Sequence, residues 1–235
     1  VEQSKLTGQE FYLKIGTYVD EIILIDSLIE EEQYEKGLEI AISILNENKK
    51  NKSALIRKGR LYSFLYKNDL AEEDLNLANE LYPNDVEVLF YRGRFYNAIN
   101  EFDKALFELN KVIELDSTYT EAYQYRALVY LNQDELDDAL LDYNKTIELE
   151  KENPERYTYR AIFHQGFSED YDQALLDYTK AIELDPNNPN RFEDRAEFFS
   201  DYIKDYNKAL IDYTKAIELE PENAELWFDR GSFFG

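Results

Sequence analysis

Arginines and acids recur at two fixed positions along this sequence. A catalytic site needs one distinct set of groups, whereas here the same combination returns in every copy. Regularly spaced ion pairs between facing helices stabilise a fold when their carboxylates are well seated. We therefore interpret both series as structural ion pairs. The arginines are Arg92, Arg126, Arg160, Arg195 and Arg230, and the acids are Glu108, Asp142, Asp177 and Asp212.

Other reactive side chains give no pattern that chemistry requires. His164 is the one histidine and falls in a row of aromatic residues, so we interpret it as a packing residue. There is no cysteine, which excludes a thiolate nucleophile, a disulfide and a cysteine metal site. The acids near Asp134 lack the spacing and glycine of a calcium loop. No glycine-rich phosphate loop or nucleophile elbow is present. We therefore predict no catalytic residue, no cofactor and no metal.

Charge restricts the partners. The chain has 26 basic and 50 acidic residues, a net charge of −24, which repels phosphate backbones and anionic lipid surfaces. No apolar run reaches the roughly 20 residues that cross a bilayer, and the N-terminus lacks a signal-peptide pattern. We therefore expect a soluble chain with a protein or peptide partner, no nucleic acid and no membrane insertion. For its location we favour the cytoplasm and leave a removed targeting segment open, because the sequence begins on Val1 and ends inside a repeat.

The elements that carry these residues are repeats. Tyr171–Pro186 returns as Tyr206–Pro221 with twelve of sixteen residues identical, and its apolar residues have helical spacing. Asn153 and Asn188, each followed by proline, predict helix N-caps. One extra residue in repeats five and six falls in the turn between the two helices. We predict an N-terminal extension, 1–17, partly helical, and a single array over 18–235 with repeats at 18–51, 52–85, 86–119, 120–153, 154–188, 189–223 and a partial 224–235.

The repeats share a large residue near their start, glycine or alanine four residues on, an aromatic three further, and a small residue opening the second half, as in Leu89, Gly93, Tyr96 and Ala105. Single repeats depart from this pattern, with Glu21 in place of the large residue in repeat one and His164 in place of the aromatic in repeat five. This pattern resembles the tetratricopeptide repeat. The resemblance implies an all-α, right-handed superhelical solenoid of antiparallel helix pairs, with about six full repeats and a partial seventh. It also implies that the first helices line a concave groove. Stacking of neighbours is required in any case, because one hairpin cannot bury its apolar stripe alone.

Residues opposite the glycine or alanine row of each first helix are expected to face this groove. They change along the chain from basic through aromatic to acidic, although the net charge is strongly negative. The predicted partner-binding residues are Arg57, Arg60 and Arg94 at the basic end, Phe90, Tyr91, Gln124, Tyr125, Thr158 and Tyr159 in the middle, and Glu193, Asp194 and Glu197 at the acidic end.

The function that these features favour is a non-catalytic scaffold. Its groove would bind an extended or helical segment whose acidic part faces the arginines and whose basic part faces the acids. The alternative within the groove is that the charges only solubilise the chain and the tyrosines pack. A structural module that self-associates through its terminal repeats is a second hypothesis, motivated by Leu226, Trp227, Phe233 and Phe234. A regulatory arm of a larger protein is a third.

Overall fold

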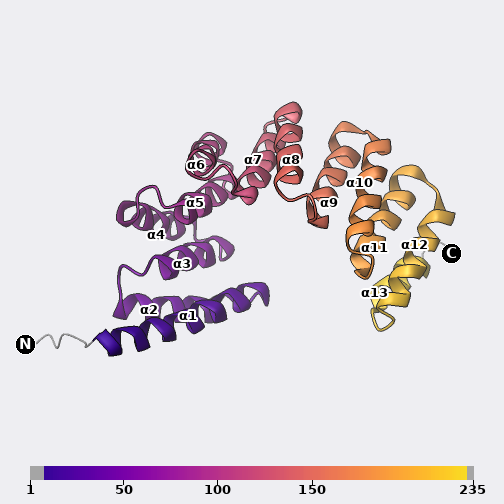
Figure 1. Ribbon diagram of the computed structural model, residues 1–235. Helices are drawn as coiled ribbons and strands as arrows, with labels where there is room; N and C mark the ends of the chain where they lie inside the picture. The colour runs from indigo at the N-terminus through magenta and orange to yellow at the C-terminus, as the bar shows by residue number, and fades with distance from the viewer. Residues whose placement is uncertain (1–7, 232–235) are drawn as a thin grey trace, which may run out of the picture. The chain divides into compact units, whose positions relative to one another are not determined.

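The computed structural model describes the backbone of residues 8–231 and the side chains of residues 18–231 (Figure 1). Every regular element over this range is a helix. Two compact units, Val1–Ala122 and Tyr123–Gly235, divide the chain, and each is described by itself. None of the described helices combines the length and apolar character that a membrane span needs.

Unit 1 is a series of antiparallel helix pairs in which each helix contacts the next. The first helices of its pairs are α1, α3 and α5, and the second helices are α2, α4 and α6. The N-terminal extension was predicted to end at residue 17, but α1 runs through this limit without a break. Residues 1–7 of the extension lie outside the described range. The bounds are α1 Gly8–Glu30, α2 Tyr34–Glu47, α3 Lys52–Phe64, α4 Asn68–Leu81, α5 Val86–Ala98 and α6 Phe102–Leu115.

Unit 2 continues the same scheme, and α7, Thr120–Asn132, contains the division between the units. Two short π-helical segments, η1 and η2, follow the first helices of the repeats that are one residue longer. The remaining bounds are α8 Leu136–Leu149, α9 Pro154–Phe163, η1 His164–Ser168, α10 Tyr171–Leu184, α11 Pro189–Phe198, η2 Phe199–Ile203, α12 Tyr206–Leu219 and α13 Ala224–Gly231. The all-α class, the helix pairs and about six repeats with a final helix are therefore confirmed.

Asparagine and aspartate side chains start the first helices. Asn51 Oδ1 accepts from the backbone N–H of Ala54, and Asp85 Oδ1 accepts from Val88. Asn153 and Asn188 cap α9 and α11, each with proline in the first turn, as predicted. Such caps satisfy backbone donors that a helix start leaves without a partner. The sequence thus determines where these first helices begin.

The turn inside each hairpin is closed by one recurring hydrogen bond. In the 34-residue repeats, Lys67 N–H donates to the carbonyl of Tyr62 at 2.8 Å and Glu101 N–H to that of Tyr96 at 2.9 Å. In the longer repeats the donor and acceptor are separated by one more residue along the chain, as in Asp170 N–H, which donates to the carbonyl of His164 at 3.0 Å. The extra residue is therefore absorbed as a π turn at the end of the first helix. The predicted position, in the turn between helices, is right to within that last helical turn.

The core lies between helices that approach closely through small side chains. Ala71 and Ala105 on the second helices of unit 1 are fully buried, and Leu75 and Leu109 pack one turn further on. In unit 2, tyrosines take the places of these leucines, and the rings of Tyr143, Tyr178 and Tyr213 are buried. This packing holds the first helices in place and leaves one of their faces uncovered by second helices.

Candidate functional site

The arginine and acid series form ion pairs, as predicted. Four pairs join a first helix to the second helix of its own repeat at 2.7–2.8 Å: Arg92–Glu108, Arg126–Asp142, Arg160–Asp177 and Arg195–Asp212. A fifth pair extends the series into repeat two, where the sequence has no arginine at that place: Lys58–Asp74 at 2.9 Å. Arg230 instead stacks over the ring of Trp227, 4.6 Å from its centroid.

Burial shifts the pKa of two acids in this series, Asp142 and Glu108. It raises the pKa of Asp142, and the two hydrogen bonds and the charge of Arg126 counteract that shift. Burial likewise raises the pKa of Glu108, against the opposing charge of Arg92. A raised pKa can mark a catalytic acid, but a carboxylate that is held by a guanidinium at the same place in four successive repeats acts as a structural partner.

His164 is buried at the end of α9. Its ring packs edge-on against Phe163, and its Nδ1 lies 3.0 Å from Oγ of Ser168. Burial lowers the pKa of His164, so the neutral ring is favoured. This is the environment of a packing residue, as the sequence suggested. The residues described contain no group of three or more His, Cys, Asp or Glu side chains arranged to hold a metal ion.

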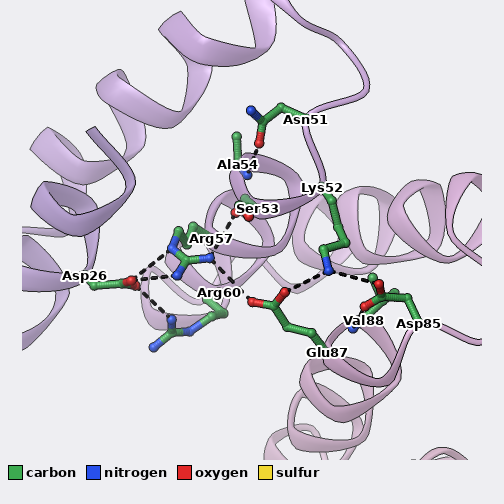
Figure 2. Close-up of polar contacts among 10 residues, drawn as sticks. All are labelled: Asp26, Asn51, Lys52, Ser53, Ala54, Arg57, Arg60, Asp85, Glu87 and Val88. Atoms are coloured by element: carbon green, nitrogen blue, oxygen red, sulfur yellow. Dashed lines mark hydrogen bonds and ion pairs between the residues drawn. The ribbon is translucent and has the colours of Figure 1, made fainter. Parts of the chain in front are cut away.

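The predicted basic end is a network of paired charges on the first helices of unit 1 (Figure 2). Asp26 on α1 accepts from Arg57 Nη2 at 2.6 Å and from Arg60 Nη1 at 3.2 Å. Glu87 on α5 lies 3.7 Å from Arg57 Nη1 and 3.1 Å from Lys52 Nζ. Both arginines therefore already hold a carboxylate of their own chain.

Aromatic rings continue this network on α5. The guanidinium of Arg60 lies 4.8 Å from the ring centroid of Tyr91, and that of Arg94 lies 5.5 Å from it. Such cation–π contacts fix long side chains at little cost in solvation. Phe90 is buried against Tyr119, so it packs inside unit 1 and does not offer a contact surface.

The middle residues on unit 2 are also engaged. Thr158 is buried, and its hydroxyl accepts from Arg191 Nη1 at 3.4 Å. Gln124 Oε1 accepts from Arg156 Nη1. Tyr159 is half-buried beside the core cluster of α7 to α9, and Tyr125 is half-buried too. Thr158 is therefore buried, whereas the side chains of Tyr125 and Tyr159 stay partly exposed.

The predicted acidic end gathers carboxylates of α11 and α13 on unit 2. Burial is the main cause that raises the pKa of Glu193 to about 7, and like charges add to it: Glu197, Asp229, Asp194 and Glu225. Burial also raises the pKa of Glu197, with Asp194 next in effect. Arg191 opposes the same shift in Asp194. We call Glu193, Asp194, Glu197 and Asp229 the acidic face.

Residues that the sequence analysis missed are the internal partners of the groove positions. Asp26 precedes Arg60 by 34 residues, so the two occupy the same place in neighbouring repeats, and that offset was the available signal. Arg191 was missed as well; it lies 3.6 Å from Glu155 and contacts Thr158. Its signal in the sequence was Arg156, which stands 35 residues earlier at the same place in the preceding repeat.

The last described helix carries two exposed aromatic side chains. Leu226 is fully buried with Phe192 and Ile217, whereas Trp227 is half-exposed and Phe228 is 77% exposed. Trp227 Nε1 donates to the carbonyl of Pro221. Phe233 and Phe234, also expected at this end, lie outside the described residues.

Comparison with known proteins agrees with this fold. The tetratricopeptide repeat family model matches residues 53–85, 166–188 and 201–223. Among curated proteins, no significant match to the sequence is found. A thermophilic TPR protein of Thermus thermophilus aligns with a TM-score of 0.65 at 22% identity, over 77% of this chain and 96% of its own.

Two further solved structures have the same fold. Pseudomonas aeruginosa pilF aligns with a TM-score of 0.64 at 16% identity, over 91% of this chain and 96% of its own. YrrB, described as a TPR protein with an unusual peptide-binding site, aligns with a TM-score of 0.52 at 19% identity, over 81% and 97%. These structures share the fold of this chain. The three segments that match the family model identify the chain as a tetratricopeptide repeat protein.

Proposed function

We propose that this protein is a non-catalytic scaffold that binds segments of partner proteins on the exposed faces of its first helices. On unit 2, the acidic face binds a segment rich in lysine or arginine. Tetratricopeptide repeat proteins are in general interaction modules. The solved YrrB structure is described as having a peptide-binding site, which supports the kind of ligand but not its identity.

The observation that carries the proposal is the pKa of Glu193, raised to about 7 by burial and by neighbouring carboxylates. Like charges held together on a folded surface store unfavourable electrostatic energy, which a bound cation relieves. The acids of the arginine–acid series, such as Asp212, differ, because a guanidinium lies 2.7–2.8 Å from each of them, whereas on the acidic face Arg191 is 4.0 Å from Asp194. The acidic face is therefore the part of unit 2 best suited to a basic ligand.

An apolar contact is available beside these carboxylates. Phe228 directly precedes Asp229 on α13 and exposes 77% of its surface. Long lysine and arginine side chains carry methylene groups that pack on such a ring while their charged ends reach acids. The expected ligand is thus a segment in which basic side chains alternate with short apolar contacts.

Fluorescence anisotropy with a labelled oligolysine peptide tests this function. The double substitution Glu193→Gln and Glu197→Gln should weaken binding about tenfold at low salt and flatten its salt dependence. A matched control, Glu152→Gln with Glu169→Gln, removes the same charge from exposed positions elsewhere on unit 2. Equal affinities of the two double variants would refute the proposal.

Self-assembly through the terminal repeats is a second candidate, and exposed Trp227 and Phe228 favour it. Light scattering across a concentration series, with Phe228→Ser as the comparison, separates the two functions. A wild-type protein that stays monomeric at all concentrations rules self-assembly out. A role as the regulatory arm of a larger protein stays a prediction that the full reading frame tests.

A further inference from the structure

A cleft of about 730 Å³ opens on unit 1 beside the charge network of Figure 2. α1 forms one wall, and the loop between α2 and α3 with the start of α3 forms the other. Its volume falls within the range of typical ligand sites, which runs from about 300 to 1,000 Å³. The cleft is separate from the acidic face, because that face belongs to unit 2.

The floor of the cleft is apolar. Val19 and Ile23 lie one helical turn apart on α1 and expose 53% and 62% of their surfaces. Ile22 adds a partly buried side chain between them. Two β-branched residues exposed on one side of a helix offer a rigid surface for another apolar group, because their side chains lose little freedom on contact.

The rim of the cleft carries three basic and two acidic side chains. The basic ones are Lys50, Lys52 and Arg57, and the acidic ones are Asp26 and Glu47. The three basic residues belong to the segment 49–67, which contains seven basic residues and no acid in a chain whose net charge is −24. Basic side chains therefore outnumber acidic ones in this lining, in contrast to the chain as a whole.

Asp26 shows how a carboxylate is held at this rim. It lines the cleft and receives hydrogen bonds from Arg57 at 2.6 Å and from Arg60 at 3.2 Å (Figure 2). Arg57 has a second carboxylate within reach, since Glu87 lies 3.7 Å from its Nη1. Arginine presents several donors in a planar fork, so one guanidinium can serve two acids at once.

We propose that this cleft is a docking site for a partner-protein segment in which a large apolar side chain stands next to glutamate or aspartate. The apolar side chain packs on Val19 and Ile23. The neighbouring carboxylate binds Arg57 and Lys50, in competition with Asp26 for the same guanidinium. Asp26 therefore acts as an internal competitor that sets how strongly the acidic group is bound.

Anisotropy with a fluorescein-labelled peptide of leucines flanked by glutamates tests the proposal on the whole chain. Ile23→Ser and Arg57→Gln should each weaken binding about tenfold, whereas Asp26→Asn should strengthen it, because it removes the carboxylate that Arg57 and Arg60 share. Control variants on α2 make the same chemical changes away from the cleft: Ile42→Ser and Lys36→Gln should leave binding unchanged. Circular dichroism checks that every variant is folded.

Changes in the peptide test the same contacts without altering the protein. Replacing its leucines by alanine, or its glutamates by glutamine, should each weaken binding to the wild type about tenfold. Equal binding of all three peptides, or weaker binding by folded Asp26→Asn, would overturn the proposal. So would a wild-type dimer, measured by light scattering, that Ile23→Ser dissociates, because the occupant would then be a second copy of this chain.

Discussion

A Cβ atom added at Gly59 would lie 2.8 Å from Cγ of Leu75 on the facing helix, closer than two carbon atoms approach without displacement. Gly93 and Leu109 repeat the relationship, also at 2.8 Å, in the next repeat. In the later repeats both positions change together: alanine replaces the glycine, and a flat tyrosine ring replaces the branched leucine. Those pairs are Ala127 with Tyr143, Ala161 with Tyr178 and Ala196 with Tyr213.

This contact predicts that Gly59→Ala lowers the free energy of unfolding. Overpacking costs about 1–3 kcal/mol, against which the better helix propensity of alanine returns about 1 kcal/mol. Urea denaturation measures the difference. Gly166→Ala is the control, because a Cβ at Gly166 meets no atom within 4 Å. A loss of stability in Gly166→Ala equal to that in Gly59→Ala would contradict the packing argument.

The ion pairs between arginines and acids of facing helices predict a large loss of stability when Asp142 is replaced. Asp142→Ala leaves the guanidinium of Arg126 half-buried without its carboxylate, which should cost about 3 kcal/mol. Glu148→Ala in the same helix removes an exposed partner of Lys145 and should cost far less, because solvent screens this pair. The double variant Asp142→Leu with Arg126→Met, which replaces both charges by apolar side chains, should be much more stable than Asp142→Ala. Thermal and urea unfolding of the wild type and these three variants measure the effect. If Asp142→Ala were no less stable than Glu148→Ala, the ion pair would not contribute to the stability of the fold.

The arginine–acid ion pairs were predictable from the sequence because both partners recur in repeats three to six. The contacts of Arg57 and Arg60 were not, since Asp26 belongs to a different repeat and no later repeat has the same combination. Phe90 and Thr158 show a further limit. Helical spacing identifies the side of a helix on which a residue lies, but neighbouring helices decide whether that side is covered, and here Tyr119 and Arg191 cover them.

Glu193 predicts a dependence of stability on pH. Its pKa is raised from 4.5 to about 7 in the folded protein, so its contribution to stability is fully present below the lower value. That contribution is lost as pH rises through about 7, because the folded protein disfavours the ionised form. The melting temperature of Glu193→Gln should therefore fall less than that of the wild type between about pH 5 and pH 8. Parallel profiles would show that Glu193 is not under electrostatic strain.

His164 predicts that stability depends on pH in the opposite direction, with a loss as the pH falls. Burial lowers its pKa below 6.5, so its contribution is present above that value and is lost as pH falls towards the folded-state pKa. His164→Phe introduces the residue found at the same place, Phe199, in the next repeat. The variant should lose less stability than the wild type on acidification from about pH 7 to pH 5. Calorimetry at matched pH values measures the difference, and a pH profile of the variant identical to that of the wild type would contradict the lowered pKa of His164.

The π turn at His164–Ser168 predicts where the chain tolerates a deletion. Gly166 lies in the middle of this turn and has open space around it. Without it, Asp170 N–H can still reach the carbonyl of His164, because the equivalent turns of the shorter repeats close the same hydrogen bond with one residue fewer. Short changes of loop length cost little free energy when the ends keep their positions.

Deletion of Gly166 should therefore give a cooperatively unfolding protein whose melting temperature lies within a few degrees of the wild type. Deletion of Ala161 is the matched comparison: this residue is fully buried in α9, and its loss would rotate the rest of the helix by about 100° relative to its core contacts. That variant should lose cooperative unfolding in unit 2. If both deletions proved equally damaging, the extra residue would be a required part of the repeat and not an insertion absorbed by the turn.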